Sequence, residues 1–403
     1  MSHAHAKTLS ADRIRIPDGH VWHKLPIIGL VVGVLGLGAS FALGSGDMKQ
    51  FYHSYLVAFC FFLSIALGGF FFVLVQYLAR AGWSVVVRRT AENLMGTLPV
   101  FALLFIPIAL GMHDLYHWTH EEAVAADHLL QGKSPFLNTG FFLVRAAIYF
   151  VVWAGASWYF RGRSIAQDES GDKETTRKTQ AVAAPALMLY ALSQTFASID
   201  WLMSLDPHWY STMFGVYFFS GSLVAVIGSL SAVSLVMKRM GLLAEVITAE
   251  HYHDLGKLLF GFTVFWAYIA FSQFFLIWYG NIPEETLWFH HRLEGSWKSF
   301  TLFLAGGHFV VPFFILINRT IKRIPATLLI MALWMLGMHY LDLYWLVMPI
   351  LHPHGVHFAL VDVTTFVGIG GFFFGAFAWL TKRAALVPHR DPRLHESLRF
   401  ENA

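Results

Sequence analysis

The chain has 403 residues, of which 56% are hydrophobic and only 13% are charged. A soluble domain usually carries about 25% charged residues, so the composition excludes an ordinary soluble enzyme. The net charge of +3 is too small to indicate nucleic acid as a partner, and the single cysteine excludes both an internal disulfide and a cysteine-ligated iron–sulfur cluster, which needs about four thiolates.

Apolar runs follow one another along the chain, each near the roughly 20 residues that a helix needs to cross hydrocarbon. They predict ten spans, at 25–44, 54–78, 94–113, 138–160, 181–204, 212–236, 257–279, 297–318, 326–348 and 361–381. Long continuous runs favour helices over barrel strands. The sequence thus predicts an all-α polytopic membrane protein with an N-terminal segment (1–24), a transmembrane domain (25–381) and a C-terminal tail (382–403).

Positive charge is distributed unevenly among the loops. All but five of the 28 Lys and Arg residues lie in the terminal segments and in alternate loops. The five exceptions are Lys49, Lys133, Arg145, Arg292 and Lys298. Because loops that stay in the cytoplasm are enriched in Lys and Arg, both termini are predicted to be cytoplasmic. The polar segment 1–24 lacks the apolar core of a cleaved signal peptide.

Three shorter patterns predict local structure. Gly29 and Gly33 have the spacing of small residues in helix–helix contacts, although glycine is also simply tolerated in membrane helices, and both interpretations stay open. The polar stretch 161–180 predicts a flexible loop. The stretch 242–247 has the apolar periodicity of a short amphipathic helix on the membrane surface.

The loops predicted to face outwards are rich in histidine and acidic residues. These residues gather at 113–128, 284–294 and 352–357, and Asp114 in the first group is a candidate for a proton or quinone pathway. Histidine and carboxylate side chains could ligate a metal. A hydrated surface that faces a partner subunit is the favoured interpretation.

Ionisable residues inside the spans are functional candidates, because burying them in a membrane is costly. They are Arg145, Asp200, His308, His339 and Asp342, and most fall in the outer half. We expect Asp200, His339 and Asp342, with Arg145 nearby, to form one polar cluster that passes protons or binds a quinone headgroup. A structural ion pair between Arg145 and Asp200 is the alternative.

Imidazole and carboxylate groups beside an apolar pocket suit quinol chemistry. Quinol oxidation releases protons as well as electrons, so a base must lie within hydrogen-bond reach of the hydroxyl. The chain has no recognisable electron carrier, so the electrons must leave through another subunit. Axial ligation of haem by His308 and His339 is a competing hypothesis, disfavoured because paired haems need more histidines at matched depth.

Three stretches, Ser198–Tyr217, Ala270–Thr286 and His339–Trp345, resemble the F-type subunits of bacterial alternative complex III. Those subunits are members of the NrfD/PsrC-like membrane proteins. The resemblance implies a quinol-oxidising respiratory complex in the bacterial inner membrane. Its other subunits would be a related ten-helix membrane subunit, an iron–sulfur subunit and c-type haem subunits, in some cases with a haem-copper oxidase alongside.

The resemblance also implies a fold of two four-helix bundles with two peripheral helices. An F-type subunit is expected to be structural or proton-conducting and to bind no haem or cluster itself, with quinone as its one candidate ligand. Asp200, His339 and Asp342 lie inside the matching stretches. A secondary transporter, which would work alone, and a purely structural subunit remain alternatives.

Overall fold

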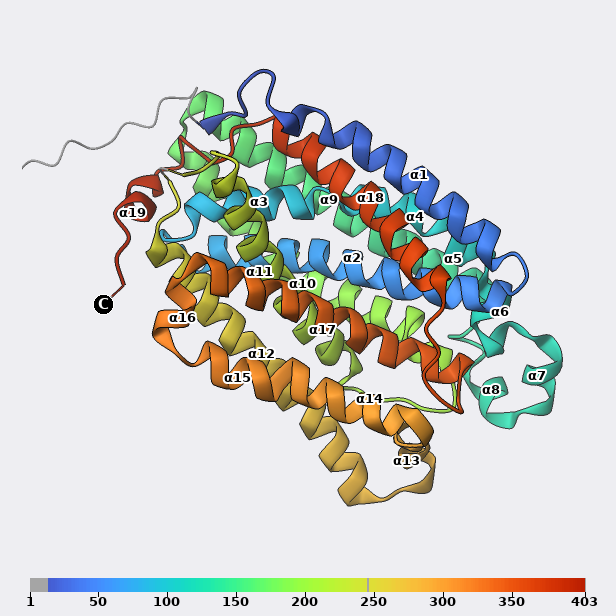
Figure 1. The fold of residues 1–403 in the computed structure, drawn as a ribbon. Coiled ribbons are helices and arrows are strands. Elements are labelled where there is room, and N and C mark those ends of the chain that lie inside the picture. Colours follow the sequence, from blue (N-terminus) through green and yellow to red (C-terminus); the bar gives the residue numbers. More distant parts are fainter. Residues whose placement is uncertain (1–13, 245, 403) are drawn as a thin grey trace, which may run out of the picture.

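The computed structural model describes residues 14–244 and 246–402 (Figure 1). Residues 1–13 of the predicted N-terminal segment, Glu245 in the predicted amphipathic stretch and Ala403 of the tail lie outside the described residues. The described chain is 80% helical and contains no strand. It includes ten helical segments that are long and apolar enough to cross a membrane, which confirms the all-α polytopic membrane fold.

Each span consists of a single helix or of consecutive short helices. The spans are α1 (Leu25–Gly44), α2 (Met48–Leu78), α3 to α5 (Val85–Met95, Leu98–Leu104, Ile106–Leu110), α9 (Thr139–Ser170), α10 with η4 (Lys173–Trp201, Met203–Leu205), α11 (Phe214–Arg239), α12 (Ala249–Gly280), α14 to α15 with η5 between them (Gly295–Ala305, Gly306–Val310, Val311–Leu316), α17 (Pro325–Leu351) and α18 (Leu360–Lys382). The connecting helices are η2 (Val21–His23), α6 (Met112–Leu115), η3 (His117–Thr119), α7 (Glu121–Ala126), α8 (His128–Lys133), α13 (Pro283–His290), α16 (Arg319–Arg323) and α19 (Leu394–Leu398).

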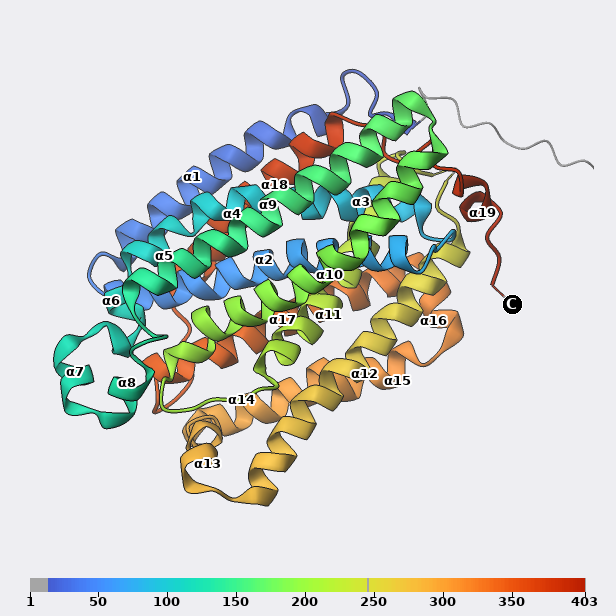
Figure 2. The same ribbon diagram turned by 180° about the vertical axis from the view of Figure 1, so that it is seen from behind.

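The spans form two four-helix bundles with α2 near the centre of the molecule (Figures 1 and 2). The first bundle contains α2, the α3–α5 segment, α9 and α10. The second contains α11, α12, the α14–α15 segment and α17, and α2 packs against α11 and α17. Helices α1 and α18 pair at the periphery. This is the arrangement that the resemblance implied.

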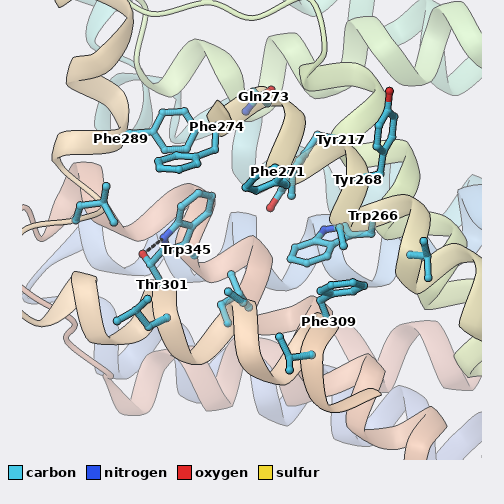
Figure 3. Close-up of a pocket in the computed structure, with 18 residues that line it drawn as sticks. Tyr217, Trp266, Tyr268, Phe271, Gln273, Phe274, Phe289, Thr301, Phe309 and Trp345 are labelled. Atoms are coloured by element: carbon cyan, nitrogen blue, oxygen red, sulfur yellow. Dashed lines mark hydrogen bonds between the residues drawn. The ribbon is translucent and has the colours of Figure 1, made fainter. Parts of the chain in front are cut away.

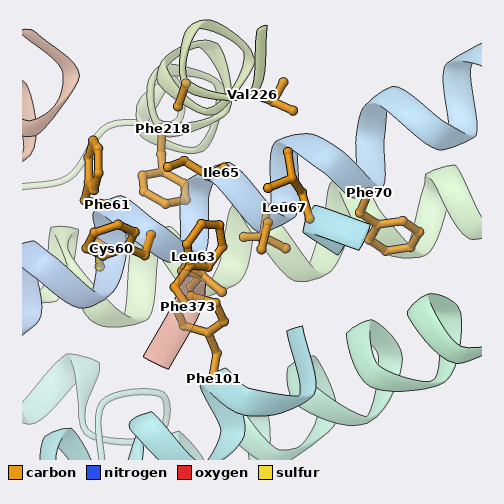
Figure 4. Close-up of a cluster of buried hydrophobic side chains, with 14 of the residues drawn as sticks. Cys60, Phe61, Leu63, Ile65, Leu67, Phe70, Phe101, Phe218, Val226 and Phe373 are labelled. Carbon is orange, nitrogen blue, oxygen red and sulfur yellow. The ribbon is translucent and has the colours of Figure 1, made fainter. Parts of the chain in front are cut away.

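Helix α2 is buried because it is apolar on every face. Figure 4 shows its side chains between neighbours from three other helices. The Phe62 ring lies 5.3 Å from that of Phe373 in α18, and the Phe59 ring lies 5.6 Å from that of Phe101 in α4. The first of these contacts joins the first bundle to the peripheral pair, and the second lies within the first bundle.

The glycines of α1 form a contact with α18, which confirms the helix-packing interpretation. A Cβ on Gly29 would lie 2.5 Å from the Cα of Gly375, and a Cβ on Gly36 would lie 2.6 Å from the Cα of Gly368. Glycine at these positions therefore lets the two backbones approach closely. Gly38, by contrast, has no atom within 4 Å of such a Cβ.

Two local predictions are wrong. The stretch 161–180 is not a flexible loop, because α9 and α10 extend through it and meet at Gly171, whose φ of 66° closes the turn. The Asp172 carboxylate caps α10 by accepting a bond from the Glu174 amide. The stretch 242–247 forms no helix in its described part, since Leu243 has a φ of 59°, and its apolar side chains are buried rather than spread on the surface.

Candidate functional site

The buried ionisable residues form two separate hydrogen-bonded groups rather than one. In the first bundle, Nε and Nη2 of Arg145 each lie 2.8 Å from one carboxylate oxygen of Asp200. The Tyr149 hydroxyl donates to the same carboxylate at 2.7 Å. The guanidinium also donates to the Phe136 carbonyl at 2.9 Å and lies 3.9 Å from the centre of the Phe136 ring. Arg145 and Asp200 thus form a buried ion pair in which the two charges neutralise each other.

The second group is centred on Asp342 in the C-terminal half of α17. Its side chain is 1% exposed. One carboxylate oxygen accepts a bond from the hydroxyl of Tyr217 in α11, and the other accepts from Nε1 of Trp266 in α12, at 3.1 Å. No cation pairs with this carboxylate among the described residues. Asp342 is therefore held by neutral donors, which leave it able to take up a proton.

His308 packs against Trp266, which binds this carboxylate, and lies in a π-helical turn within the eighth span. The turn, η5, precedes Pro312, whose missing amide and bulky ring prevent the regular bond to the His308 carbonyl. π-Turns inside helices are frequent at functional sites. The His308 ring lies 3.7 Å from that of Trp266. Both of its ring nitrogens are buried and have no hydrogen-bond partner among the described residues.

His339 lies one turn from Asp342 on the same face of α17, as its spacing predicted. Its Nε2 lies 2.8 Å from the Ser64 hydroxyl of α2, so it contacts the central helix. A Cβ on Gly221 of α11 would lie only 2.6 Å from its Cε1, so glycine at that position leaves room for the imidazole. His308 and His339 are close enough to interact electrostatically.

A cavity of about 560 Å³ adjoins the Asp342 group, between α12 and the α14–α15 segment (Figure 3). Most of its lining is apolar and aromatic. Tyr217 and Trp266 both line the cavity and bind Asp342. Gln273 adds a polar group, whose Oε1 accepts a bond from Ser211 at 3.0 Å. This combination of apolar walls and a few polar groups is typical of small-molecule sites of this size.

The prediction of one cluster is therefore wrong in its membership. His339 and Asp342 are brought together with His308, whereas Arg145 and Asp200 pair with each other in the first bundle. Asp114 lies in α6, between the third and fourth spans, near Tyr52 at the N-terminal end of α2. The apolar runs predicted the helices on which the candidate residues lie. Which candidate side chains contact one another depends on how three helices pack, and the sequence does not show this.

Sequence reasoning missed several residues of these groups. Tyr217 and Trp266 carry no charge, and apart from the position of Tyr217 at the end of a resembling stretch nothing in their pattern distinguishes them from other aromatic residues of the spans. Asp362, a buried carboxylate outside both groups, was also missed and could have been found, because it is an acidic residue near the start of the tenth run. It accepts a bond from the Ser54 hydroxyl at 2.6 Å and one from the Ala359 amide at 2.8 Å.

The histidine-rich loops contain further contacts between ionisable side chains. The imidazole of His208 is hydrogen-bonded to the carboxylate of Asp127 and holds the pKa of that carboxyl below its usual value. The rings of His113 and His120 lie 3.8 Å apart. Within residues 14–244 and 246–402, no three His, Cys, Asp or Glu side chains form a group that could hold a metal ion.

Neither a protein-family model nor a curated protein sequence matches this chain.

Proposed function

We propose that the chain is an integral membrane subunit of a quinol-oxidising respiratory complex, and that its second bundle exchanges protons at Asp342 beside a quinone-sized cavity. One observation carries the proposal: Tyr217 and Trp266 line the cavity and also donate hydrogen bonds to the buried carboxylate. The Tyr217 hydroxyl therefore connects a headgroup in the cavity to the Asp342 carboxylate.

The proton step follows from these contacts. A quinol hydroxyl that reaches Tyr217 gives its proton to the phenol oxygen while the phenol proton moves to Asp342. His308, which packs against Trp266, and His339 beyond it supply further proton acceptors towards Ser64. The electrons go to iron–sulfur clusters and c-type haems of partner subunits, because the sequence of this chain offers no carrier for them.

The decisive experiment compares two buried carboxylates in the assembled complex. Asp342→Asn keeps the shape and one acceptor oxygen, which can still take the bond from Trp266, while its NH2 group can donate to the Tyr217 oxygen; the titrating proton is lost. Asp362→Asn is the matched control, since Asp362 is also buried in the outer half but does not border the cavity. We expect normal assembly of both, and slower quinol turnover and proton release only for Asp342→Asn. Full turnover and full proton release in Asp342→Asn would refute the proposal.

The membership of a complex has its own test. Purification in mild detergent should recover haem-bearing and iron–sulfur subunits together with this chain. The isolated chain should show no haem spectrum. Recovery of a lone chain that moves a solute across vesicles would favour a secondary transporter instead.

The proposed location is the bacterial inner membrane with both termini in the cytoplasm. The described parts of the terminal segments, the α9–α10 turn and α16 lie at one end of the molecule, and the histidine-rich loops lie at the other (Figure 1). Cationic loops favour the cytoplasmic side. A reporter fused after Ala403 should therefore be active in the cytoplasm, and activity in the periplasm alone would reverse the orientation.

A further inference from the structure

A cationic pocket of about 420 Å³ lies at the end of the molecule that carries the cationic loops, far in sequence from the Asp342 group. Its lining includes Arg80, Lys173, Arg177 and Arg393, with Gln180 as a further polar group. None of the residues that line it is acidic. Side chains of like charge repel one another, so their convergence is unfavourable unless an anion binds between them.

Three segments build this pocket. Arg80 follows α2 with a φ of 50°, an uncommon conformation for a residue other than glycine. Lys173 and Arg177 are one turn apart on α10 and therefore share a face. The C-terminal tail brings Arg393, whose amide donates to the Asp391 carboxylate at 2.8 Å. Asp391 is in turn anchored by Arg88 inside the bundle. The cations are thus held in place by the fold.

Carboxylates near the pocket neutralise only part of its charge. Glu174 lies 3.8 Å from Arg177 in a pair that is largely exposed, and such pairs contribute little. Glu396 lies 3.0 Å from Arg393. Arg80 and Lys173 form no ion pair with any described residue. At least two cations in the pocket are therefore available to a ligand.

The surroundings of the pocket indicate where its ligand comes from. Leu78 precedes it on α2 and Val182 follows it on α10, and the side chain of each is 37% exposed. Met188, farther along the same helix, is 65% exposed. The pocket therefore lies where the lipid-facing surface of α10 meets the charged end of the molecule, which is the level of the phospholipid headgroups.

We propose that this pocket binds the phosphate of an anionic phospholipid, whose acyl chains lie along Leu78 and Val182. Arginine side chains bind phosphate oxygens through paired, charge-assisted hydrogen bonds. Basic pockets between membrane helices on the cytoplasmic side bind anionic headgroups in the same way. A zwitterionic headgroup would bring a quaternary ammonium group among four cations, so phosphatidylcholine should be rejected.

The test measures lipid binding to the full-length, delipidated chain in detergent by native mass spectrometry. The probes are phosphatidylglycerol, phosphatidylcholine and inorganic phosphate. The pocket variant is Lys173→Gln with Arg177→Gln. The matched control is Arg239→Gln with Arg399→Gln, which removes two exposed cations outside the pocket. Thermal unfolding without added lipid checks that both variants fold.

The unmodified chain should retain phosphatidylglycerol in preference to phosphatidylcholine. The pocket variant should bind phosphatidylglycerol on the order of 30-fold more weakly, from the usual contribution of two basic residues at an anionic surface. The control should change binding less than threefold. Equal binding of both lipids, or unchanged binding in the folded pocket variant, would overturn the proposal. Displacement of phosphatidylglycerol by inorganic phosphate would instead identify a free-phosphate site.

Discussion

Arg145 and Asp200 form a two-point ion pair in which two guanidinium nitrogens each lie 2.8 Å from one carboxylate oxygen. Both side chains are buried, and Tyr149 donates a further bond to Asp200. This geometry fits the structural alternative, in which each charge compensates the other. It also separates Asp200 from the Asp342 group that we propose to exchange protons.

Removal of one partner of this ion pair should lower the free energy of unfolding but leave quinol turnover per assembled complex nearly unchanged. Asp200→Asn leaves Arg145 buried without its counter-ion, which typically costs about 3–5 kcal/mol. Thermal unfolding in detergent should show the loss, while turnover per assembled complex stays near normal. Arg145→Met combined with Asp200→Leu should recover much of the stability, because apolar pairs often replace buried ion pairs without penalty. A stable but inactive Asp200→Asn complex would contradict this assignment.

His308 gives a test that separates chemistry from packing. His308→Phe keeps a ring against Trp266 and removes two buried nitrogens that lack hydrogen-bond partners among the described residues. Because a buried unpaired polar group is destabilising, thermal stability should be unchanged or higher. Proton release linked to quinol turnover should fall. If proton release and turnover both stay at their original level, the imidazole only fills space.

The apolar runs were sufficient to predict the number and type of the spans, but not the extent of the polar helix ends. The third span was predicted to begin at residue 94 because Arg88, Arg89 and Glu92 interrupt the apolar run. The structure begins it at Val85, since Glu92 pairs with both arginines and Asp168 pairs with Arg89. Charges that neutralise each other through tertiary contacts cannot be recognised as buried from the local sequence.

The same limit applies to the candidate site. His339 and Asp342 are three residues apart, so helical geometry alone predicts that they share a face. Tyr217 and Trp266 reach Asp342 from α11 and α12, at sequence separations of 125 and 76 residues. Arg145 and Asp200 were assigned to the same cluster because all four residues were predicted to lie at a similar depth in the membrane. A similar depth does not show which of the two bundles a residue belongs to. Contacts between helices depend on packing that the apolar pattern leaves undetermined.

The contact between α1 and α18 should be sensitive to one added side chain. In Gly29→Val the new Cβ would lie 2.5 Å from the backbone of Gly375, which cannot move aside cheaply. We expect a loss of about 1–3 kcal/mol, as for other overpacked contacts, seen as a lower unfolding temperature. Gly38→Val is the control, because its Cβ meets no atom within 4 Å. Equal stability of the two variants would show that the contact is dispensable.

The Asp127–His208 contact should make the loop between the third and fourth spans sensitive to acid. The lowered pKa of Asp127 means that its carboxylate is favoured in the folded chain. The resulting stabilisation is present above the unfolded value of about 4 and is lost as the pH falls through the lower folded value. Hydrogen exchange of residues 121–133 should therefore accelerate at low pH. Asp127→Asn should remove the pH step, and persistence of the step would assign it to another group.

Gly221 offers a way to move His339 without changing it. In Gly221→Ala the added Cβ would lie 2.6 Å from Cε1 and 2.9 Å from Nδ1 of His339, so the ring must shift and its 2.8 Å contact with Ser64 is disturbed. The cavity lining is untouched, so quinone binding should be retained. Turnover should fall by about 100-fold, the lower end of what a positioned proton-transfer group contributes.

Gly337→Ala is the matched control for that substitution. It lies on α17 near His339, and its new Cβ would meet nothing within 4 Å. Because alanine favours a helix by up to about 1 kcal/mol over glycine, this variant should be at least as stable as the original chain and fully active. Stopped-flow quinol oxidation with a pH indicator would compare the two variants. Equal turnover and proton release would show that the position of His339 has no bearing on proton transfer, and would confine the proposed proton path to Tyr217, Asp342 and His308.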